Sequence, residues 1–543
     1  MNFCRIPRSG TNLPEQSLPL KGALVQLFLA PLSVPVPLLL AAATGFLDHG
    51  RWPKLAPILA EAASLLALLA AIFSAGGLIV LGAGNSPVIG FEGAGLSARL
   101  DAVSTTILLL VMFVGWVVVR YARTYLDGEA RQGAFTGWLC LTLASVALLV
   151  TAGNLFQLLI AWIATSLFLH RLLLFYPQRI AAQRAARKKF MTARLGDASL
   201  FIASFLLVAA YRTSDVGAIL AAARSGSGGG LAIGAASLLA IAAGLKSAQF
   251  PAHGWLTEVM ETPTPVSALL HAGVINAGGF LLIRFADVML LAPGVLAALV
   301  MIGGFTALFG SLVMLTQPAV KTSLAWSTVA QMGFMIFECG LALFPLALLH
   351  IVAHSLYKAH SFLASGGAVE RVASIRRPGP VAIPKGGAVV RAFLSALAIY
   401  VLVGACFGFE HKSPQAIALG AILIFGVAYM LAQGFADTAP KALTRRTAVY
   451  AVATSVSYFA LQWATTAITA NVLPPPPPPG PLEWALIALT AASFGLVAIG
   501  QAMFPLWANH PAAAGLRVHL SNGFYANAVF DRLIGAWSMR SRS

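Results

Sequence analysis

Apolar stretches long enough to cross a bilayer alternate with short polar segments along almost the whole chain. An apolar stretch of about 18 or more residues predicts a transmembrane helix, because a helix of roughly that length spans the hydrocarbon core. We therefore predict an all-α fold, a polytopic membrane helical bundle of about 14 to 15 transmembrane helices. The candidate spans lie at about 22–47, 55–82, 102–119, 136–152, 155–176, 196–211, 231–250, 266–284, 288–316, 323–343, 345–366, 389–409, 415–434, 447–470 and 482–506.

One polar region interrupts this pattern. Lys246 follows the apolar run 231–245, and Pro251 then interrupts helical hydrogen bonding. Pro263-Thr264-Pro265 opens a second apolar run, in which His271 lies about one and a half turns further on. Ionisable residues inside a span mark functional sites, and broken helices at this depth are buried in protein or line watery cavities. The region predicts a polar pathway across the bilayer.

A second polar stripe lies in the span 345–366. His350, His354 and Lys358 fall within about 80° of one another on one helix face. Histidine titrates near neutral pH and lysine changes its pKa readily when desolvated, so an alternating row suits proton transfer through intervening water. We predict a proton pathway with Lys246 as its central protonatable site. Its candidate residues are Lys246, His253, Glu261, His271, His350, His354 and Lys358.

Simpler interpretations exist for several of these residues. A buried lysine can be a structural ion-pair partner, and His253 can be an interfacial cap. The spacing of His350 and His354 matches a helical metal pair, but no carboxylate or cysteine completes a site nearby on that helix, so no metal is predicted. Glu338 and Asp197 are interpreted as charges at headgroup depth, where charge costs little. Gly278-Gly279 is interpreted as a close helix contact.

The composition agrees with a membrane protein: 59% of the residues are hydrophobic and 10% are charged. The net charge of +17 would suit nucleic acid, but the basic residues gather in short segments between spans, so we predict no nucleic-acid partner. The basic segments 178–194, 371–385 and 441–446 are predicted to be cytoplasmic loops. The four cysteines are scattered, which indicates neither a zinc site nor a disulfide framework.

The chain divides by composition into five segments. They are a polar N-terminal segment (1–21), N-terminal transmembrane helices (22–130), a proton-conducting core (131–370), C-terminal transmembrane helices (371–506) and an amphipathic tail (507–543). The tail is expected to lie on the cytoplasmic surface or to dock on the bundle.

Long motifs in this chain resemble a known family. Residues 246–256 (KSAQFPAHGWL) and 263–272 (PTPVSALLHA) are similar to the signature of antiporter-like, proton-conducting subunits. These are the subunits of respiratory complex I, especially chain L, and of Mrp cation/proton antiporters. Further similar segments are 100–104, 121–125, 194–197, 321–331, 350–359, 522–525 and 530–533. The resemblance implies two inverted repeats with discontinuous helices. It also implies that Lys246 matches the central-channel lysine and His271 the relay histidine.

The chain departs from chain L in four places, one of which is the segment 271–280. Where chain L has a glutamate that pairs with the channel lysine, Ala161-Trp162 is followed here by Ile163. For the second channel, Lys412 is the candidate counterpart. The residues after the last candidate span, 507–543, are too few for the long lateral helix of chain L.

With these departures the chain is similar to the DabB subunits of inorganic carbon transporters. The resemblance implies a subunit that conducts a cation, expected to be H⁺, and thereby powers bicarbonate accumulation. It implies a partner of DabA type, a cytoplasmic zinc protein with carbonic-anhydrase-like chemistry. This chain is then expected to be a multi-pass inner-membrane protein in the lipid bilayer, without enzyme activity or a cofactor of its own. The alternative is a proton-translocating subunit of a complex I-like NADH–quinone oxidoreductase or an Mrp Na⁺/H⁺ antiporter.

Overall fold

The computed structural model describes residues 27–47, 54–91, 94–367, 385–409, 412–436, 439–503 and 510–534. The predicted polar N-terminal segment lies outside these residues. The division of the chain into five segments stays a prediction.

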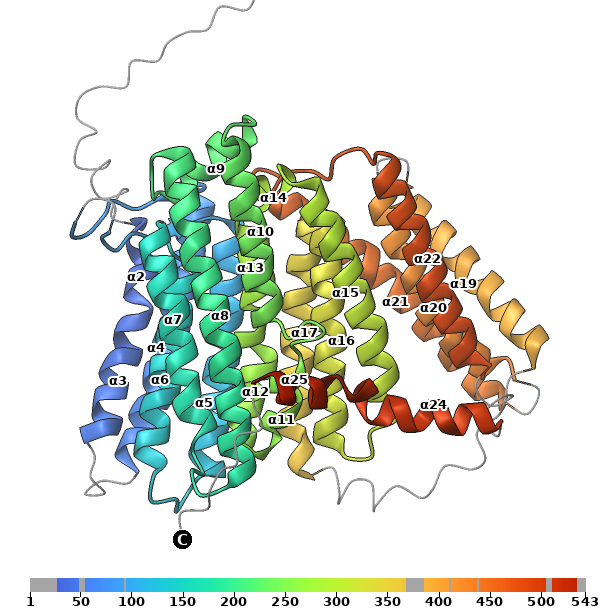
Figure 1. Cartoon of the computed structure of the whole chain (residues 1–543), viewed down its shortest axis with the longest axis horizontal. Coiled ribbons are helices and arrows are strands. Elements are labelled where there is room, and N and C mark those ends of the chain that lie inside the picture. The colour runs from blue at the N-terminus through green and yellow to red at the C-terminus, as the bar shows by residue number, and fades with distance from the viewer. Residues whose placement is uncertain are drawn as a thin grey trace, which may run out of the picture.

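Upright helices stand side by side and form one bundle (Figure 1). The long helices are α3 (Pro35–Leu47), α4 (Leu55–Leu81), α5 (Ala102–Tyr125), α6 (Gln132–Val150), α7 (Leu155–Leu173), α8 (Ile180–Tyr211), α10 (Gly229–Lys246), α15 (Pro293–Met314), α16 (Val320–Gly340), α17 (Phe344–Ala364), α19 (Gly386–Cys406), α20 (Pro414–Gly434), α21 (Lys441–Thr469) and α22 (Pro481–Ala502). The described residues contain 12 candidate membrane spans, judged by length and apolar composition. The predicted all-α membrane bundle is confirmed.

Three of these long helices, α16, α17 and α21, are not among the 12 candidate spans because they carry more polar residues. They run alongside the spans (Figure 1). The shorter elements are α2 (Ala30–Ser33), α9 (Val216–Arg224), α11 (Gly254–Glu258), η2 (Val259–Glu261), α12 (Thr264–Ala272), η3 (Val274–Asn276), α13 (Ala277–Arg284), α14 (Ala286–Leu290), η4 (Ser365–Gly367), α24 (Pro511–Ser521), η6 (Gly523–Tyr525) and α25 (Ala526–Ile534). A two-stranded antiparallel ribbon, β1 (Gly84–Asn85) and β2 (Arg99–Leu100), precedes α5.

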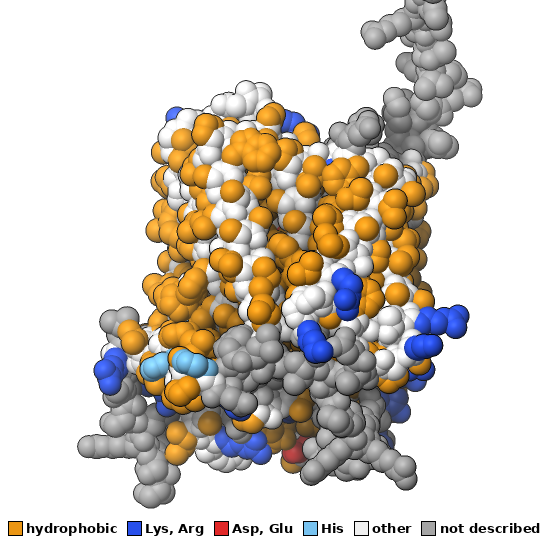
Figure 2. Space-filling model, turned by 90° about the vertical axis from the view of Figure 1, so that its right-hand side faces the viewer, with side chains coloured by type: hydrophobic (Ala, Val, Ile, Leu, Met, Phe, Trp, Pro, Cys, Tyr) orange, Lys and Arg blue, Asp and Glu red, His pale blue; other side chains and the backbone are white. Residues whose placement is uncertain are grey.

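One flank of the bundle is apolar, as a surface that faces lipid is. Figure 2 shows apolar side chains covering the upright part of the flank that is formed by the C-terminal helices. Lysine and arginine side chains on this flank gather mainly below that belt. We call the end of the bundle where α8 and α12 begin the lower end; α9 and α14 lie at the other, upper end (Figure 1).

Two of the three basic segments predicted as loops are helical, so those predictions are wrong: 180–194 belongs to α8 and 441–446 to the start of α21. The third segment, apart from Lys385, lies outside the described residues. Ile180–Tyr211 forms one helix of 32 residues, in which the first half carries the basic residues and the second half the apolar ones. Lys188 and Lys189 on this helix are buried. A helix of 32 residues is about 48 Å long, which exceeds the hydrocarbon thickness, so α8 extends past the apolar layer at its basic end.

Two helices are interrupted inside the bundle. After α10 the chain runs through an irregular segment to α11, as the Pro251 pattern predicted. The second apolar run is also divided, into α12, η3 and α13, and this break was not predicted. A Cβ atom on Gly278 of α13 would collide with the Ala243 carbonyl and the Ser247 hydroxyl. The close contact predicted at Gly278 is confirmed, and it holds α13 against the broken end of α10.

The tail docks on the bundle, which is one of the two arrangements that the sequence predicted; the other was a tail lying on the cytoplasmic surface. α24 and α25 lie across the upright helices at the lower end (Figure 1). Asn527 of α25 accepts a hydrogen bond from Lys188 (2.8 Å to Nζ) and donates one to Glu258 of α11. Asp531 pairs with Lys188 and Arg184. These contacts join the tail to α8 and to the segment after the α10 break.

Candidate functional site

Lys246 is the last residue of α10 and is 9% exposed. Its Nζ atom lies 4.4 Å from the centre of the Trp162 ring on α7, within cation–π distance. Among the described residues, Nζ has no hydrogen-bond partner. Because an ammonium group without partners is costly to bury, this position favours a lysine that gains and loses a proton.

The carboxylate that acts on Lys246 comes from α8 and not from α7. Ile163, at the position of the chain L glutamate, packs against the apolar core. Asp197 is 6% exposed, and its charge acts on Lys246 together with that of Arg194. The Arg194 Nη2 and Asp197 Oδ2 atoms are 2.5 Å apart. Asp197, interpreted from the sequence as a charge at headgroup depth, is buried and paired with Arg194, and it supplies a negative charge that acts on the central lysine.

Two further buried lysines were not predicted as site residues. Lys189 donates from Nζ to the carbonyl oxygen (2.7 Å) and the hydroxyl oxygen (3.0 Å) of Ser166 on α7. The preceding Lys188 instead pairs with Glu258 (2.7 Å) and with the tail residue Asp531. The sequence predicted both lysines in a cytoplasmic loop, because basic residues between two spans usually lie outside the membrane.

The structure brings together the predicted residues of α12 and α17. His354 Nε2 lies 3.1 Å from the carbonyl oxygen of His271, and Lys358 Nζ donates to the carbonyl oxygen of Leu324 (3.1 Å). The His271 ring stacks on Phe362 with 4.4 Å between ring centres. Neither ring nitrogen of His271 has a hydrogen-bond partner in the described part of the chain. These groups lie within an otherwise apolar core. Together with Lys246 and His350 we call them the buried row.

The row continues toward the upper end through His350. Its Nδ1 atom lies 3.0 Å from Glu338 Oε2 on α16. Glu338 is buried and His350 is partly buried. Glu338 is therefore the acidic partner that the sequence reasoning did not find for this helix. A cavity of about 760 Å³ borders these two residues, His354 and Tyr458, between α16–α17 and the C-terminal helices. The row therefore ends at a space large enough for many waters.

Three predicted residues lie outside this row. His253, 1% exposed, packs among aromatic rings in the break after α10, with its ring centre 5.1 Å from that of Trp326. Glu261 ends η2, and its side chain lies outside the described part of the structure. Lys412 lies between α19 and α20 and donates to Gln462 Oε1 (2.6 Å). The structure therefore does not bring Lys412 to the buried row.

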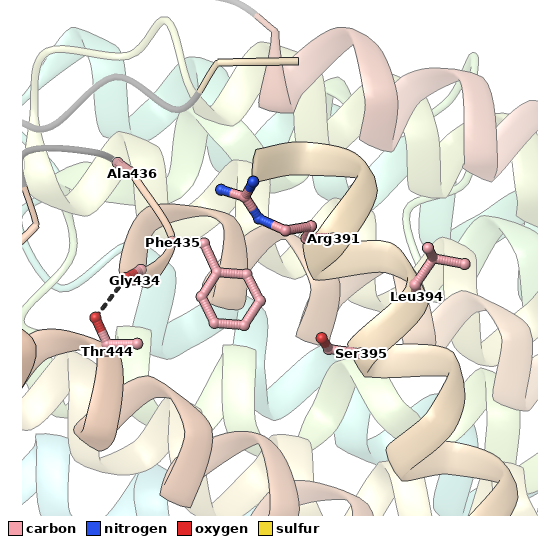
Figure 3. A pocket seen from close by; sticks show the side chains of 7 residues that line it. All are labelled: Arg391, Leu394, Ser395, Gly434, Phe435, Ala436 and Thr444. Carbon is pink, nitrogen blue, oxygen red and sulfur yellow. Dashed lines mark hydrogen bonds between the residues drawn. The ribbon is translucent and has the colours of Figure 1, made fainter. Parts of the chain in front are cut away.

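A separate cavity of about 490 Å³ lies between the lower ends of α19, α20 and α21 (Figure 3). Arg391 is the charged side chain among its lining residues, and Phe435 projects into the same space (Figure 3). It shares no lining residue with the cavity beside His350. We assign it no part in the buried row.

Comparisons with known proteins agree with this architecture. Residues 152–378 match the family model described as NADH:quinone oxidoreductase/Mrp antiporter, TM, and residues 93–136 match that of complex I chain 5, N-terminus. The chain is similar to the structure of the Mrp complex from Dietzia sp. DQ12-45-1b, with a TM-score of 0.60 and 22% identity over 95% of this chain and 61% of that chain. This likeness shows the fold.

Two curated relatives are more similar. The "Probable inorganic carbon transporter subunit DabB" of Hydrogenovibrio crunogenus is 45% identical over 58% of this chain and 60% of its own length. The "Probable inorganic carbon transporter subunit DabB2" of Halothiobacillus neapolitanus is 35% identical over 92% of both chains. The chain belongs to the DabB family. As a DabB-family protein it is a membrane transport subunit, and membership of such multi-subunit systems implies partner proteins.

Proposed function

We propose that this DabB-family chain conducts H⁺ through the buried lysine–histidine row and so powers inorganic carbon uptake. The observation that carries the proposal is the row itself. Lys246, His271, His354 and Lys358 are each at most 9% exposed. The first two lie on candidate membrane spans, and the other two lie on α17, which runs alongside those spans. Buried ionisable groups at this depth are expensive to maintain, so a transport role is the economical explanation for them.

We propose that the lower end of the bundle faces the cytoplasm. Arg184, Arg187 and Arg194 of α8 lie toward this end, as do Lys441 and Arg445 at the start of α21. This distribution supports an inner-membrane protein that follows the positive-inside rule. Protons would then enter from the cavity beside His350 and leave near the start of α8.

The energy of such a current is sufficient for solute accumulation. One charge that crosses the membrane releases about 2.3 kcal/mol per 100 mV of membrane potential. We propose that a DabA-like cytoplasmic zinc protein uses this energy to convert CO₂ to bicarbonate, since this partner is what the family resemblance implies. The docked tail and the basic end of α8 offer a surface that such a partner can reach.

The test is Lys246→Ala, with bicarbonate accumulation measured in cells and the amount of protein in the membrane measured in parallel. We expect accumulation to be lost while the protein remains in the membrane, because the central protonatable group is gone. Lys54→Ala is the control, since it removes an exposed lysine with no predicted place in a proton pathway, and accumulation should persist. Normal accumulation in Lys246→Ala would refute the proposal.

A second candidate function is a proton-translocating subunit of a complex I-like or Mrp-type assembly. The family model that matches residues 152–378 favours it, because that model covers both systems. Purification of the tagged chain in gentle detergent separates the candidates. A large soluble partner with bound zinc would support the carbon pump, whereas quinone-reductase or antiporter subunits would support the second function.

A further inference from the structure

Lys189 is a buried lysine whose surroundings differ from those of a structural ion pair. Its contacts in the described structure are two hydrogen bonds to Ser166, and it forms no salt bridge there. Lys188, one residue earlier and equally buried, has two carboxylate partners, Glu258 and Asp531. A buried lysine without a paired carboxylate is easily deprotonated, whereas a paired one stays charged.

Ser166 suits both protonation states of Lys189. The carbonyl oxygen accepts a hydrogen bond from an ammonium group or from a neutral amine. The hydroxyl group accepts from the ammonium form and, after rotation, donates to the lone pair of the neutral form. Lys189 therefore keeps its contacts with α7 when it loses a proton.

Lys189 and Lys246 both line a small cavity of about 20 Å³. Thr192, Trp255 and apolar side chains complete its lining. A cavity of roughly 10–15 Å³ or more holds one water when polar partners are present. The Trp255 indole nitrogen and Lys246 Nζ are buried donors without partners among the described residues. Both residues line the cavity, so a water there has donors from which it can accept hydrogen bonds.

We propose that Lys189 transfers protons between Lys246 and the lower end of the bundle through one water in this cavity. In the step toward the lower end, a Lys246 N–H bond breaks and its proton passes to the water. The water passes one of its own protons to the neutral Lys189 amine, so charge and atoms balance without any redox change. His170 lies in the last turn of α7 and is partly buried, and it is the next titratable group of the proposed path toward the lower end. Its ring centre lies 5.2 Å from that of Phe190.

This inference rests on the proposed function, and proton flux into proteoliposomes under a membrane potential tests it. Lys189→Met removes the titratable group, and flux should fall by on the order of 100-fold, a typical loss for a positioned acid–base group. Lys189→Arg keeps the positive charge, but arginine does not release a proton near neutral pH. It should therefore lose flux as Lys189→Met does.

Lys188→Met is the matched control, because it removes an adjacent buried lysine of structural character; flux per folded protein should persist. Wild-type flux in Lys189→Arg would overturn the inference, since charge alone would then suffice. This variant also decides the matter if Lys189→Met fails to fold. Normal flux in Lys189→Met beside an inactive Lys246→Met would overturn the inference and leave the proposed function intact. Normal flux in Lys246→Met would overturn both.

Discussion

Asp101→Asn is expected to destabilise the protein strongly, because it leaves a buried arginine without its countercharge. Asp101 is fully buried and Arg284, at the end of α13, is 2% exposed. Arg284 donates to both carboxylate oxygens, at 2.6 and 3.2 Å, and Arg99 Nε donates at 2.7 Å. The pair fixes the upper end of the broken helix α12–α13, which carries His271, to the start of α5.

The size of the effect follows from burial. Removing one partner of a buried ion pair costs about 3–5 kcal/mol. Asn is itself a good N-cap, so the cap that Asp101 provides to Ser104 is kept and the loss reports the charge. Glu61→Gln breaks the more exposed pair with Arg123 and should cost roughly 0–1 kcal/mol. The double variant Asp101→Asn/Arg284→Met should lose less than the sum of the single variants.

Reversible unfolding in detergent micelles measures these differences. The dependence on pH gives a second check. Burial alone would raise the pKa of Asp101, but the charge and hydrogen bonds of Arg284, with Arg99 and Ser104, hold it well below its usual range. The stabilisation is therefore complete above the unfolded pKa of about 3.9 and is lost progressively as the pH falls from there through the lower folded value.

The stability difference between wild type and Asp101→Asn should then be equal in neutral and in mildly acidic buffer, above the unfolded pKa of the carboxyl. A difference that shrinks across that range would contradict the depressed pKa. A loss in Asp101→Asn no larger than that in Glu61→Gln would refute the argument from burial.

Three further predictions concern the site and the tail. Asp197→Asn should lower proton flux in proteoliposomes by about tenfold or more, because the countercharge of the central lysine is removed; unchanged flux would exclude this role. Gly254→Ala places a Cβ against the Asn527 amide, so α25 should detach and become sensitive to limited proteolysis, unlike Gly76→Ala, where a Cβ meets no atom within 4 Å. Glu338→Gln should reduce flux at an unchanged membrane level, and normal flux would indicate that its ion pair is structural.

Much of the fold and part of the row could be predicted from local pattern. Apolar runs identify spans, since the need for continuous apolar surface is a property of each segment by itself. The one-face spacing of His354 and Lys358 on α17, and the break after Lys246, were equally readable. The break between α12 and α13 was not, because no proline marks it.

The sequence by itself determined that this chain is a polytopic helical bundle with ionisable residues inside its spans, because hydropathy and helical periodicity are properties of neighbouring residues. Only the tertiary structure decided which of those residues meet. It placed Asp197 beside Lys246, Glu338 beside His350, and Lys189 across a small cavity from Lys246. Whether a charged residue between two spans lies in water or in the core depends on the helices packed around it. Those helices come from distant parts of the chain, so no local pattern contains the answer.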